Sequence, residues 1–179
     1  MPRPSSRDVI LDALQQLLIE QGLPAVTLEK VAAAANVSKG GLLYHFPTKE
    51  ALITGLAQRL ADAADAEFER AATTDDVVGF YLRASLPSSP DRALFWSLLA
   101  ALRTNDVASA EARRLIIYCF ARWAEILTER IDDPVTAQIV RLVGDGLYLS
   151  ALADLPLPEQ SVLDTMAERL AQLAGTAPS

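Results

Sequence analysis

The sequence has little of what disulfide-stabilised, secreted and membrane proteins contain. Cys119 is the only cysteine, so no disulfide can form within the chain, which fits a reducing compartment. No basic segment followed by an apolar run opens the chain. The longest unbroken apolar stretches, such as residues 98–102, are far shorter than the ~20 residues of a membrane span. We therefore expect a cytoplasmic protein without a signal peptide or a membrane partner.

Side chains suited to catalysis are also scarce. His45 is the only histidine, and the sequence has no metal-ligand cluster, no nucleophile elbow and no phosphate-binding glycine loop. Cys119 has no base near it in the sequence, so a buried structural thiol is the simpler interpretation. These absences argue against an enzyme and against a bound metal or cofactor.

Positive charge is scarce and unevenly placed. The net charge is −7 over 179 residues, which taken alone argues against nucleic-acid binding. Residues 1–50 carry five basic and five acidic side chains and are neutral, whereas residues 51–179 carry eleven basic and eighteen acidic ones. All three lysines lie in the first fifty residues. The acidic excess therefore belongs to the second part of the chain, which need not touch DNA.

Helical periodicity is what the sequence does contain. Apolar residues recur at helical spacing, and no segment alternates as a strand does. Capping residues, glycines and prolines divide the chain into about nine helices, at residues 6–21, 28–35, 39–46, 49–72, 77–86, 91–103, 109–131, 135–155 and 159–174. We predict an all-α protein, with a three-helix helix-turn-helix domain at residues 1–50 and a helical ligand-binding and dimerisation bundle at residues 51–179.

The segment that follows Thr27 has the plan of a helix-turn-helix. Thr27 is a good N-cap for a helix, and Asn36 tolerates the left-handed backbone of a tight turn. Ser38 can cap a short second helix, which Pro47 ends. Three apolar residues are spaced to face the inside of this unit: Val37, Leu42 and Phe46.

The opposite side of the short helix offers groups that DNA contacts use. Lys39 can bind a phosphate or a guanine edge, and Tyr44 and His45 can hydrogen-bond to the DNA backbone. Gly40 and Gly41 have no side chains, so the helix backbone can come close to the groove. That gain would offset the ~1 kcal/mol that each glycine costs in a helix.

Three further residues lie at helix N-termini, which suit phosphate oxygens: Thr27, Ser38 and Lys49. Taken singly, the hydroxyls are equally well explained as caps and the paired glycines as a weak helix start. The combination of all these residues in one short segment is what favours DNA binding.

The DNA-binding signature of the TetR family resembles one stretch of this chain, TLEKVAAAANVSKGGLLYHFPTKEAL, from Thr27 to Leu52. The family's usual pattern is similar to T-x-x-x-I-A-x-x-A-G-V-S-x-G-T-L-Y-x-H-F-x-S-K-E-x-L. By position, the resemblance implies that this chain contacts operator DNA through Thr27, Ser38, Lys39, Gly41, Tyr44, His45 and Lys49.

The chain departs from that pattern at three positions. Asn36 replaces the usual turn glycine, and Gly41 stands where threonine is common. Leu43 stands where tyrosine is common, with Tyr44 next to it, and Leu43 can instead meet a thymine methyl group. The sequence therefore leaves open which side chain reads which base.

The resemblance also implies a dimer formed by the last two helices. The helix at residues 135–155 is apolar on more than one face, which fits burial against both a core and a second subunit. The last helix carries an apolar stripe, whose alternative role is to complete the monomer's own core. The interface residues that we expect are Leu149, Leu152, Leu163, Met166, Leu170 and Leu173.

A ligand pocket among the middle helices is the third implication. Aromatic and polar side chains are mixed there, as they are in sites with apolar walls and a few polar groups. The aromatic residues could instead belong to the core, and Asp145 could simply pair with Arg141 on the same helix. The ligand contacts that we expect are Phe95, Trp96, Tyr118, Arg122, Trp123, Asp145 and Tyr148.

The sequence thus predicts a dimeric repressor that binds a palindromic operator in double-stranded DNA and is released by a small, largely apolar or aromatic effector. The effector would shift the helix at residues 49–72 and so change the spacing of the two recognition helices, ~34 Å apart on DNA. One alternative is a regulator controlled by a protein partner or by no ligand. Another is a helical dimeric interaction module that has lost DNA binding, which Gly41, Leu43 and the acidic balance favour.

Overall fold

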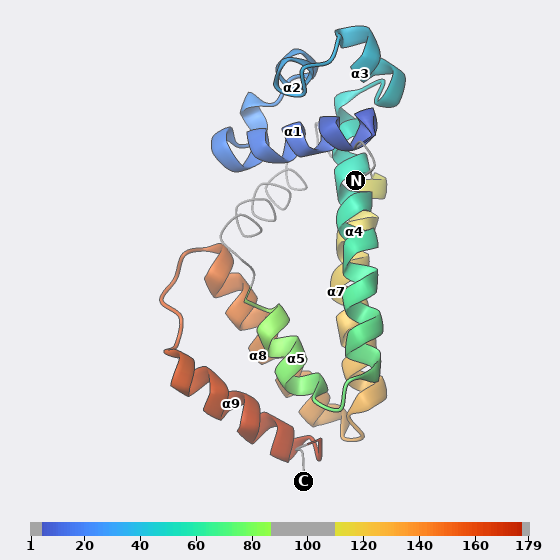
Figure 1. Cartoon of the computed structure of the whole chain (residues 1–179). Helices are drawn as coiled ribbons and strands as arrows, with labels where there is room; N and C mark the ends of the chain where they lie inside the picture. The colour runs from blue at the N-terminus through green and yellow to red at the C-terminus, as the bar shows by residue number, and fades with distance from the viewer. Residues whose placement is uncertain (1–4, 87–109, 177–179) are drawn as a thin grey trace. The chain divides into compact units, whose positions relative to one another are not determined.

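The computed structural model describes residues 5–86 and 110–176, and all regular structure in these ranges is helical (Figure 1). The elements are α1 (Ser6–Gln21), the 3₁₀-helix η1 (Leu23–Ala25), α2 (Leu28–Ala34), α3 (Lys39–His45), α4 (Lys49–Thr73), α5 (Val77–Ala84), α7 (Ala110–Arg130), α8 (Pro134–Leu152) and α9 (Gln160–Leu173). The all-α prediction is confirmed. The predicted helix at residues 91–103 lies outside the described residues.

Capping chemistry explains most of the helix ends. Side-chain oxygens of Thr27, Asp76 and Asp133 accept hydrogen bonds from backbone N–H groups in the first turns of α2, α5 and α8. Helix α8 ends three residues earlier than predicted. Asp154 takes a left-handed backbone with φ of 52°, and the Leu155 N–H donates back to the Ser150 carbonyl. None of the helices described combines the length and the apolar character that a membrane crossing requires.

The chain divides into two compact units. Of the described residues, unit 1 holds those up to Ala61 and the start of α7 as far as Ile116, and unit 2 holds the others. Helices α4 and α7 therefore contribute to both units. The predicted functional boundary at residue 50 stays a prediction, and packing carries unit 1 further along α4.

Unit 1 is built on α1. Ser5 caps α1 by accepting a hydrogen bond from the Asp8 N–H, and Gly22 ends it with a φ of 71°. The apolar stripe of α1 is buried against residues of α2, α3, α4 and α7. This core includes Ile10, Leu14, Leu18, Val31, Leu42, Phe46, Leu52, Ile53, Leu56 and Ile116.

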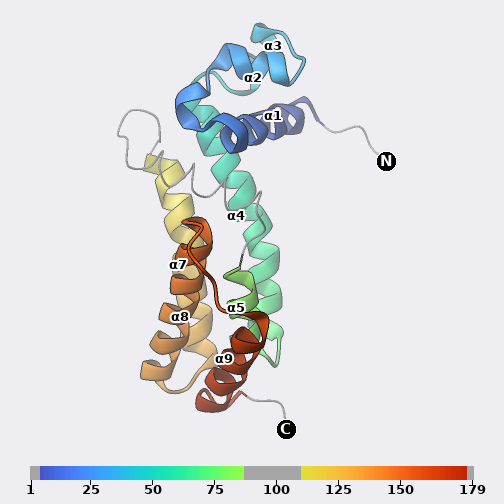
Figure 2. The same ribbon diagram turned by 90° about the vertical axis from the view of Figure 1, so that its left-hand side faces the viewer.

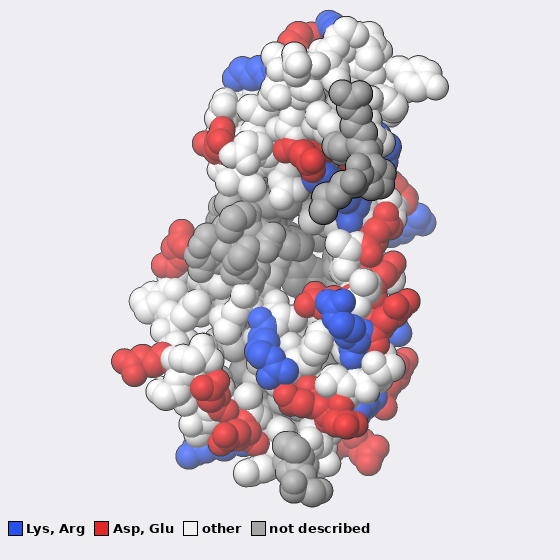
Figure 3. All heavy atoms as spheres, in the orientation of Figure 1, with Lys and Arg blue, Asp and Glu red and all other residues white. Residues whose placement is uncertain are grey.

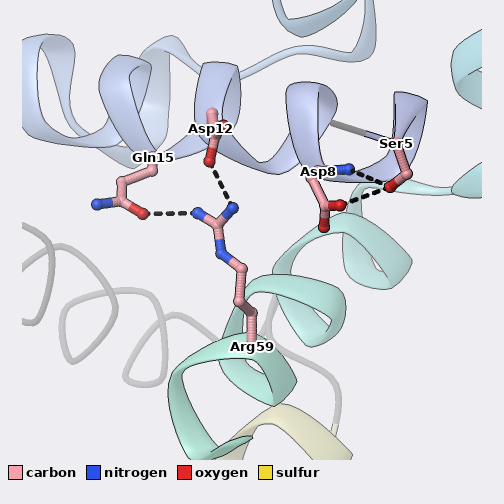
Figure 4. A network of polar contacts seen from close by, with 5 residues as sticks. All are labelled: Ser5, Asp8, Asp12, Gln15 and Arg59. Atoms are coloured by element: carbon pink, nitrogen blue, oxygen red, sulfur yellow. Dashed lines mark hydrogen bonds and ion pairs between the residues drawn. The ribbon is translucent and has the colours of Figure 1, made fainter. Parts of the chain in front are cut away.

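A polar contact also joins α1 to α4 (Figure 4). The Arg59 guanidinium of α4 donates to the Asp12 carboxylate at 2.6 Å and to the Gln15 side-chain oxygen at 2.7 Å. The Asp12 side chain is 69% exposed, so this ion pair adds little to stability. A forked guanidinium held at two points does, however, fix the orientation of α1 against α4.

Unit 2 has an aromatic core centred on Trp123 of α7. Its ring lies 5.4 Å from Phe68 of α4, and 6.2 and 5.0 Å from Phe80 and Tyr81 of α5, between ring centroids. Helix α5 in turn packs against α8 and α9 (Figures 1 and 2). Cys119 is half-buried at the edge of this core, and burial raises the pKa of its thiol to about 11, so the thiol is neutral and unreactive at neutral pH.

Tyr81 fastens α5 to α8. Its hydroxyl lies 3.0 Å from Asp145 Oδ1 and 3.1 Å from the Arg141 carbonyl oxygen. The ring occupies the space that a Cβ on Gly144 would need, so glycine is required there by close packing. Burial, followed by the neighbouring Asp145 charge, raises the pKa of Tyr81 far above its usual value.

Candidate nucleic-acid interface

The helix-turn-helix of unit 1 forms as the sequence predicts. The Thr27 hydroxyl accepts from the Lys30 N–H at 3.2 Å, and the Ser38 hydroxyl accepts from the Gly41 N–H at 3.0 Å. Asn36 takes a φ of 52° at the turn between α2 and α3. A longer-branched side chain would be strained in this left-handed conformation, whereas asparagine tolerates it.

The inward side of α3 is also as predicted. Leu42 is fully buried, and Phe46, directly after the helix, is 3% exposed. Val37 is half-buried and packs against the same core. A Cβ on Gly55 of α4 would clash with the Phe46 ring, so α3 and α4 meet in close contact at this point.

The outward side of α3 is open to solvent. Tyr44 is 85% exposed, an unusual position for a large aromatic side chain in a stable unit. Four consecutive exposed residues precede it at the start of the helix: Ser38, Lys39, Gly40 and Gly41. Such a surface, with an exposed aromatic ring and little side-chain bulk, suits contact with a large, flat partner.

Helix α3 contains two adjacent glycines, and packing within the protein does not require the first of them, Gly40. A Cβ there would meet nothing within 4 Å, whereas one on Gly41 would lie 3.2 Å from the Ser38 hydroxyl oxygen. Neither glycine has a left-handed backbone. The fold therefore gives no reason for Gly40, which favours the interpretation that an outside partner needs the space.

Most of the other residues predicted from the sequence to contact DNA are partly buried or already bonded within the protein. Leu43 and His45 are half-buried, Leu43 against the core and His45 with its ring 5.1 Å from that of Tyr44. Lys49 is half-buried and donates to the Leu23 carbonyl at 3.3 Å, and desolvation lowers the pKa of its ammonium. Thr27 is exposed.

Two charged residues at this surface were missed by sequence reasoning. Glu29 of α2 pairs with Lys39 of α3 at 2.7 Å, and the Arg7 guanidinium lies 5.5 Å from the centre of the Phe46 ring. Glu29 and Lys39 are ten residues apart, and no spacing rule joins residues across a helix-turn-helix. Only the crossing of α2 and α3 brings these two side chains together.

Charged groups of both signs are interspersed on the face of unit 2 seen in Figure 3. In unit 1, residues 5–50 carry four lysines and arginines: Arg7, Lys30, Lys39 and Lys49. The interface therefore lacks a large basic patch, and its contacts must depend on a few well-placed side chains.

The structure places the predicted ligand residues in several environments. Trp123 lies in the aromatic core, and Asp145 accepts from Tyr81 and from Arg141, the latter at 2.9 Å. Phe95 and Trp96 lie outside the described residues. The other three contact their own surroundings: Tyr118 with Asp65 and Phe68, Arg122 with Glu125 and Glu129, and Tyr148 with Phe120.

A cavity of about 70 Å³ lies elsewhere in unit 2, between α5, α8 and α9. Its lining includes Leu82, Leu86, Leu147, Leu163, Met166, Arg83 and Asp164, and none of the predicted ligand residues. Pockets that bind drug-sized ligands measure roughly 300–1,000 Å³. This cavity is far too small for an organic effector in its present form.

The predicted interface residues divide between surface and core. Leu149 and Leu173 are 57% and 58% exposed, whereas Leu152 is buried. The other three are half-buried: Leu163, Met166 and Leu170. Helix α8 also presents a longer exposed apolar stripe, which sequence reasoning did not resolve because the helix is apolar nearly all round: Val135, Ile139, Leu142 and Leu149.

A helix-turn-helix with an open second helix, carried on a helical bundle, is the arrangement of DNA-binding transcriptional regulators. Two family models match the chain: "Bacterial regulatory proteins, tetR family" over residues 10–56, and "Tetracyclin repressor-like, C-terminal domain" over residues 75–175. The chain therefore belongs to the TetR family of transcriptional regulators, which are DNA-binding proteins and not enzymes.

Individual relatives agree with this assignment. The chain is 29% identical over 165 residues to the HTH-type transcriptional regulator BetI of Rhizobium meliloti, covering 82% of this chain and 77% of that one. The Streptomyces coelicolor A3(2) protein SCO7518 superposes with a TM-score of 0.71 at 26% identity, over 96% of this chain and 99% of that one. The multidrug binding protein EbrR, in complex with malachite green, has a TM-score of 0.72 at 23% identity, over 98% and 100% of the two chains.

Proposed function

We propose that the chain is a cytoplasmic, dimeric repressor that reads a palindromic operator with α3 and leaves it when a small, largely apolar or aromatic effector binds unit 2. The observation that carries the DNA-reading part is the outward side of α3. Tyr44 is 85% exposed, and a side chain at Gly40 would meet nothing in the protein. Both features are without use in the free chain and useful against a DNA groove.

The DNA contacts that we propose are those of the sequence pattern, with different weights. Ser38, Lys39 and Tyr44 are exposed and can reach DNA directly. Lys49 would have to leave the Leu23 carbonyl, and Leu43 offers only its outer edge, so we assign both a smaller contribution. Contacts to phosphates would set the register of the protein, and Lys39 and Leu43 would read bases.

Dimerisation is supported by the exposed stripe of α8. Val135, Ile139, Leu142 and Leu149 follow one another at i, i+4, i+7 and i+14 along one side of the helix. Gly146 lies on the same side with nothing within 4 Å of the position of its Cβ, so a second backbone can come close there. A continuous exposed apolar stripe along one helix is typical of a subunit interface.

The effector is supported by the composition of unit 2 and by one relative. Trp123, Tyr118 and Asp145 join an aromatic core to a carboxylate within one network of ring and hydrogen-bond contacts. EbrR, whose fold this chain shares, has been crystallised with malachite green and with ethidium. An effector that entered the cavity between α5, α8 and α9 would have to displace side chains, because that cavity measures about 70 Å³.

The effector proposal is tested by release from DNA. The protein bound to a fragment of its own upstream DNA is titrated with malachite green, ethidium and a panel of uncharged aromatic compounds. We expect at least one compound to lower operator affinity and also to raise the melting temperature of the free protein, because binding to the folded state alone stabilises it. Release that needs a protein fraction, while every compound leaves both quantities unchanged, would favour the partner-controlled alternative.

A further inference from the structure

We propose that Glu29 is a specificity-determining residue of the DNA interface, which neutralises Lys39 toward phosphates while leaving it free to reach a base. The proposal rests on the proposed function of α3 as the DNA-reading helix. It assigns to Glu29 the task of lowering affinity for DNA other than the operator.

The contact itself is short and lies on the surface that would face DNA. Lys39 Nζ donates to Glu29 Oε1 at 2.7 Å, and the two side chains are 59% and 63% exposed. The hydrogen bond from Lys39, followed by one from the backbone, lowers the pKa of the Glu29 carboxyl, so this group is ionised at neutral pH. Neither side chain takes part in the core of unit 1. An exposed ion pair of this kind contributes little to folding, so the fold alone gives no strong reason for it.

The interface has so few cationic side chains that pairing one of them with a carboxylate must change its affinity for DNA. In the described part of the helix-turn-helix domain, three other cationic side chains are present, of which Arg7 lies over Phe46 and Lys49 donates to Leu23. Lys39 is the cation of α3 itself. A carboxylate at 2.7 Å leaves the pair without net charge and so removes most of the attraction of Lys39 for phosphate.

The Glu29–Lys39 pair should affect the affinity for random DNA and the affinity for the operator differently. Random DNA offers the interface little besides phosphates, and binding to it depends on the number of cations that replace counterions. The Lys39 ammonium has three N–H donors and uses one on Glu29. The other two can reach the edge of a guanine in the operator, with Glu29 holding the amine in place. Glu29 therefore weakens binding to random DNA more than binding to the operator.

The test compares affinities for a scrambled duplex and for the protein's own upstream fragment, by fluorescence anisotropy over a range of salt concentrations. The variants are Glu29→Gln, Lys39→Met and the double variant. Glu20→Gln is the matched control, because it makes the same charge change in unit 1 at a carboxylate that accepts from Gln16. All variants should keep the melting temperature of the wild type, since these side chains are exposed.

We expect Glu29→Gln to raise affinity for the scrambled duplex about three- to tenfold at low salt and to make its salt dependence steeper by about one counterion per subunit. The upstream fragment should gain less, so the specificity ratio falls. In the Lys39→Met background the same substitution only relieves repulsion, so it should raise affinity for the scrambled duplex and for the upstream fragment alike and leave the specificity ratio unchanged. Equal effects of Glu29→Gln and Glu20→Gln, or a fall in the specificity ratio that persists without Lys39, would overturn the proposal. Wild-type protein that prefers no upstream fragment would instead contradict the repressor function, and the scrambled-duplex comparison would still report on Glu29.

Discussion

Among single residues, Gly40 is one at which folding stability and DNA binding should favour different side chains. It lies in the first turn of α3, where a Cβ would meet nothing within 4 Å. Alanine is the better helix former, so the substitution Gly40→Ala stabilises α3 by up to about 1 kcal/mol. On DNA, the added methyl group would stand between the helix backbone and the groove.

Gly40→Ala is therefore expected to raise the melting temperature and to lower operator affinity, by at least about tenfold if the backbone approaches the groove closely. Calorimetry and a DNA titration on the same preparation measure the two effects. Gly41→Ala is a useful comparison, since its Cβ would press on the Ser38 hydroxyl and should gain less stability. Unchanged DNA affinity in Gly40→Ala would mean that Gly40 is only a weak helix start.

Prediction from the sequence succeeded for features that depend on residue type and on neighbours close in the chain. The caps Thr27 and Ser38, the left-handed Asn36 and the burial of Leu42 and Phe46 follow from residue type and spacing. It could not foresee the contact of Lys39 with Glu29 or that of Lys49 with the Leu23 carbonyl. Both contacts join residues from different elements, and only the packing of those elements determines them.

At the scale of elements, α8 has one packed side and one exposed apolar side. One side is fastened to α5 through Tyr81 and Gly144, and the other presents the exposed apolar stripe. The sequence indicates that this helix is buried on more than one side but not which residues face which neighbour. Leu152, predicted at the interface, is buried in the monomer, while Leu142 is 60% exposed. Because apolar residues occur nearly all round this helix, the sequence pattern does not show which side faces the core, and only the fold distinguishes the two sides.

Leu149→Glu tests whether the stripe is a subunit interface. Leu149 of α8 and Ile117 of α7 are both 57% exposed, so Ile117→Glu introduces the same charge at an equally exposed apolar position on another helix. We expect Leu149→Glu to convert the dimer to a folded monomer in sedimentation or light scattering and to weaken operator binding at least about tenfold, because a half-site alone binds poorly. Ile117→Glu should remain dimeric. A Leu149→Glu variant with wild-type mass and affinity would place the interface elsewhere.

At the scale of the whole molecule, charge distribution reconciles an acidic chain with DNA binding. The net charge is −7, yet residues 1–50 are neutral and contain all three lysines. DNA binding through so few cations should depend on accurate placement more than on general attraction, and it should be selective. Sequence could establish the helix-turn-helix, the all-helical fold and the family, whereas the ligand residues stay a prediction. Of these residues, some lie in the aromatic core and others form local ion pairs. Residues 95 and 96 lie outside the described part of the chain.

The measurement that tests the central claim most directly is a titration of the purified protein against fragments of its own upstream DNA, at several salt concentrations. A Lys39→Ala, Tyr44→Ala double variant is measured beside the wild type, since both side chains are exposed and lie outside the core of unit 1. We expect nanomolar binding to one palindromic fragment, a salt dependence that reports the few phosphate contacts, and loss of that binding in the variant. Binding that is absent, or that is equal in the variant, would contradict this expectation and leave a dimeric interaction module without a DNA-reading α3.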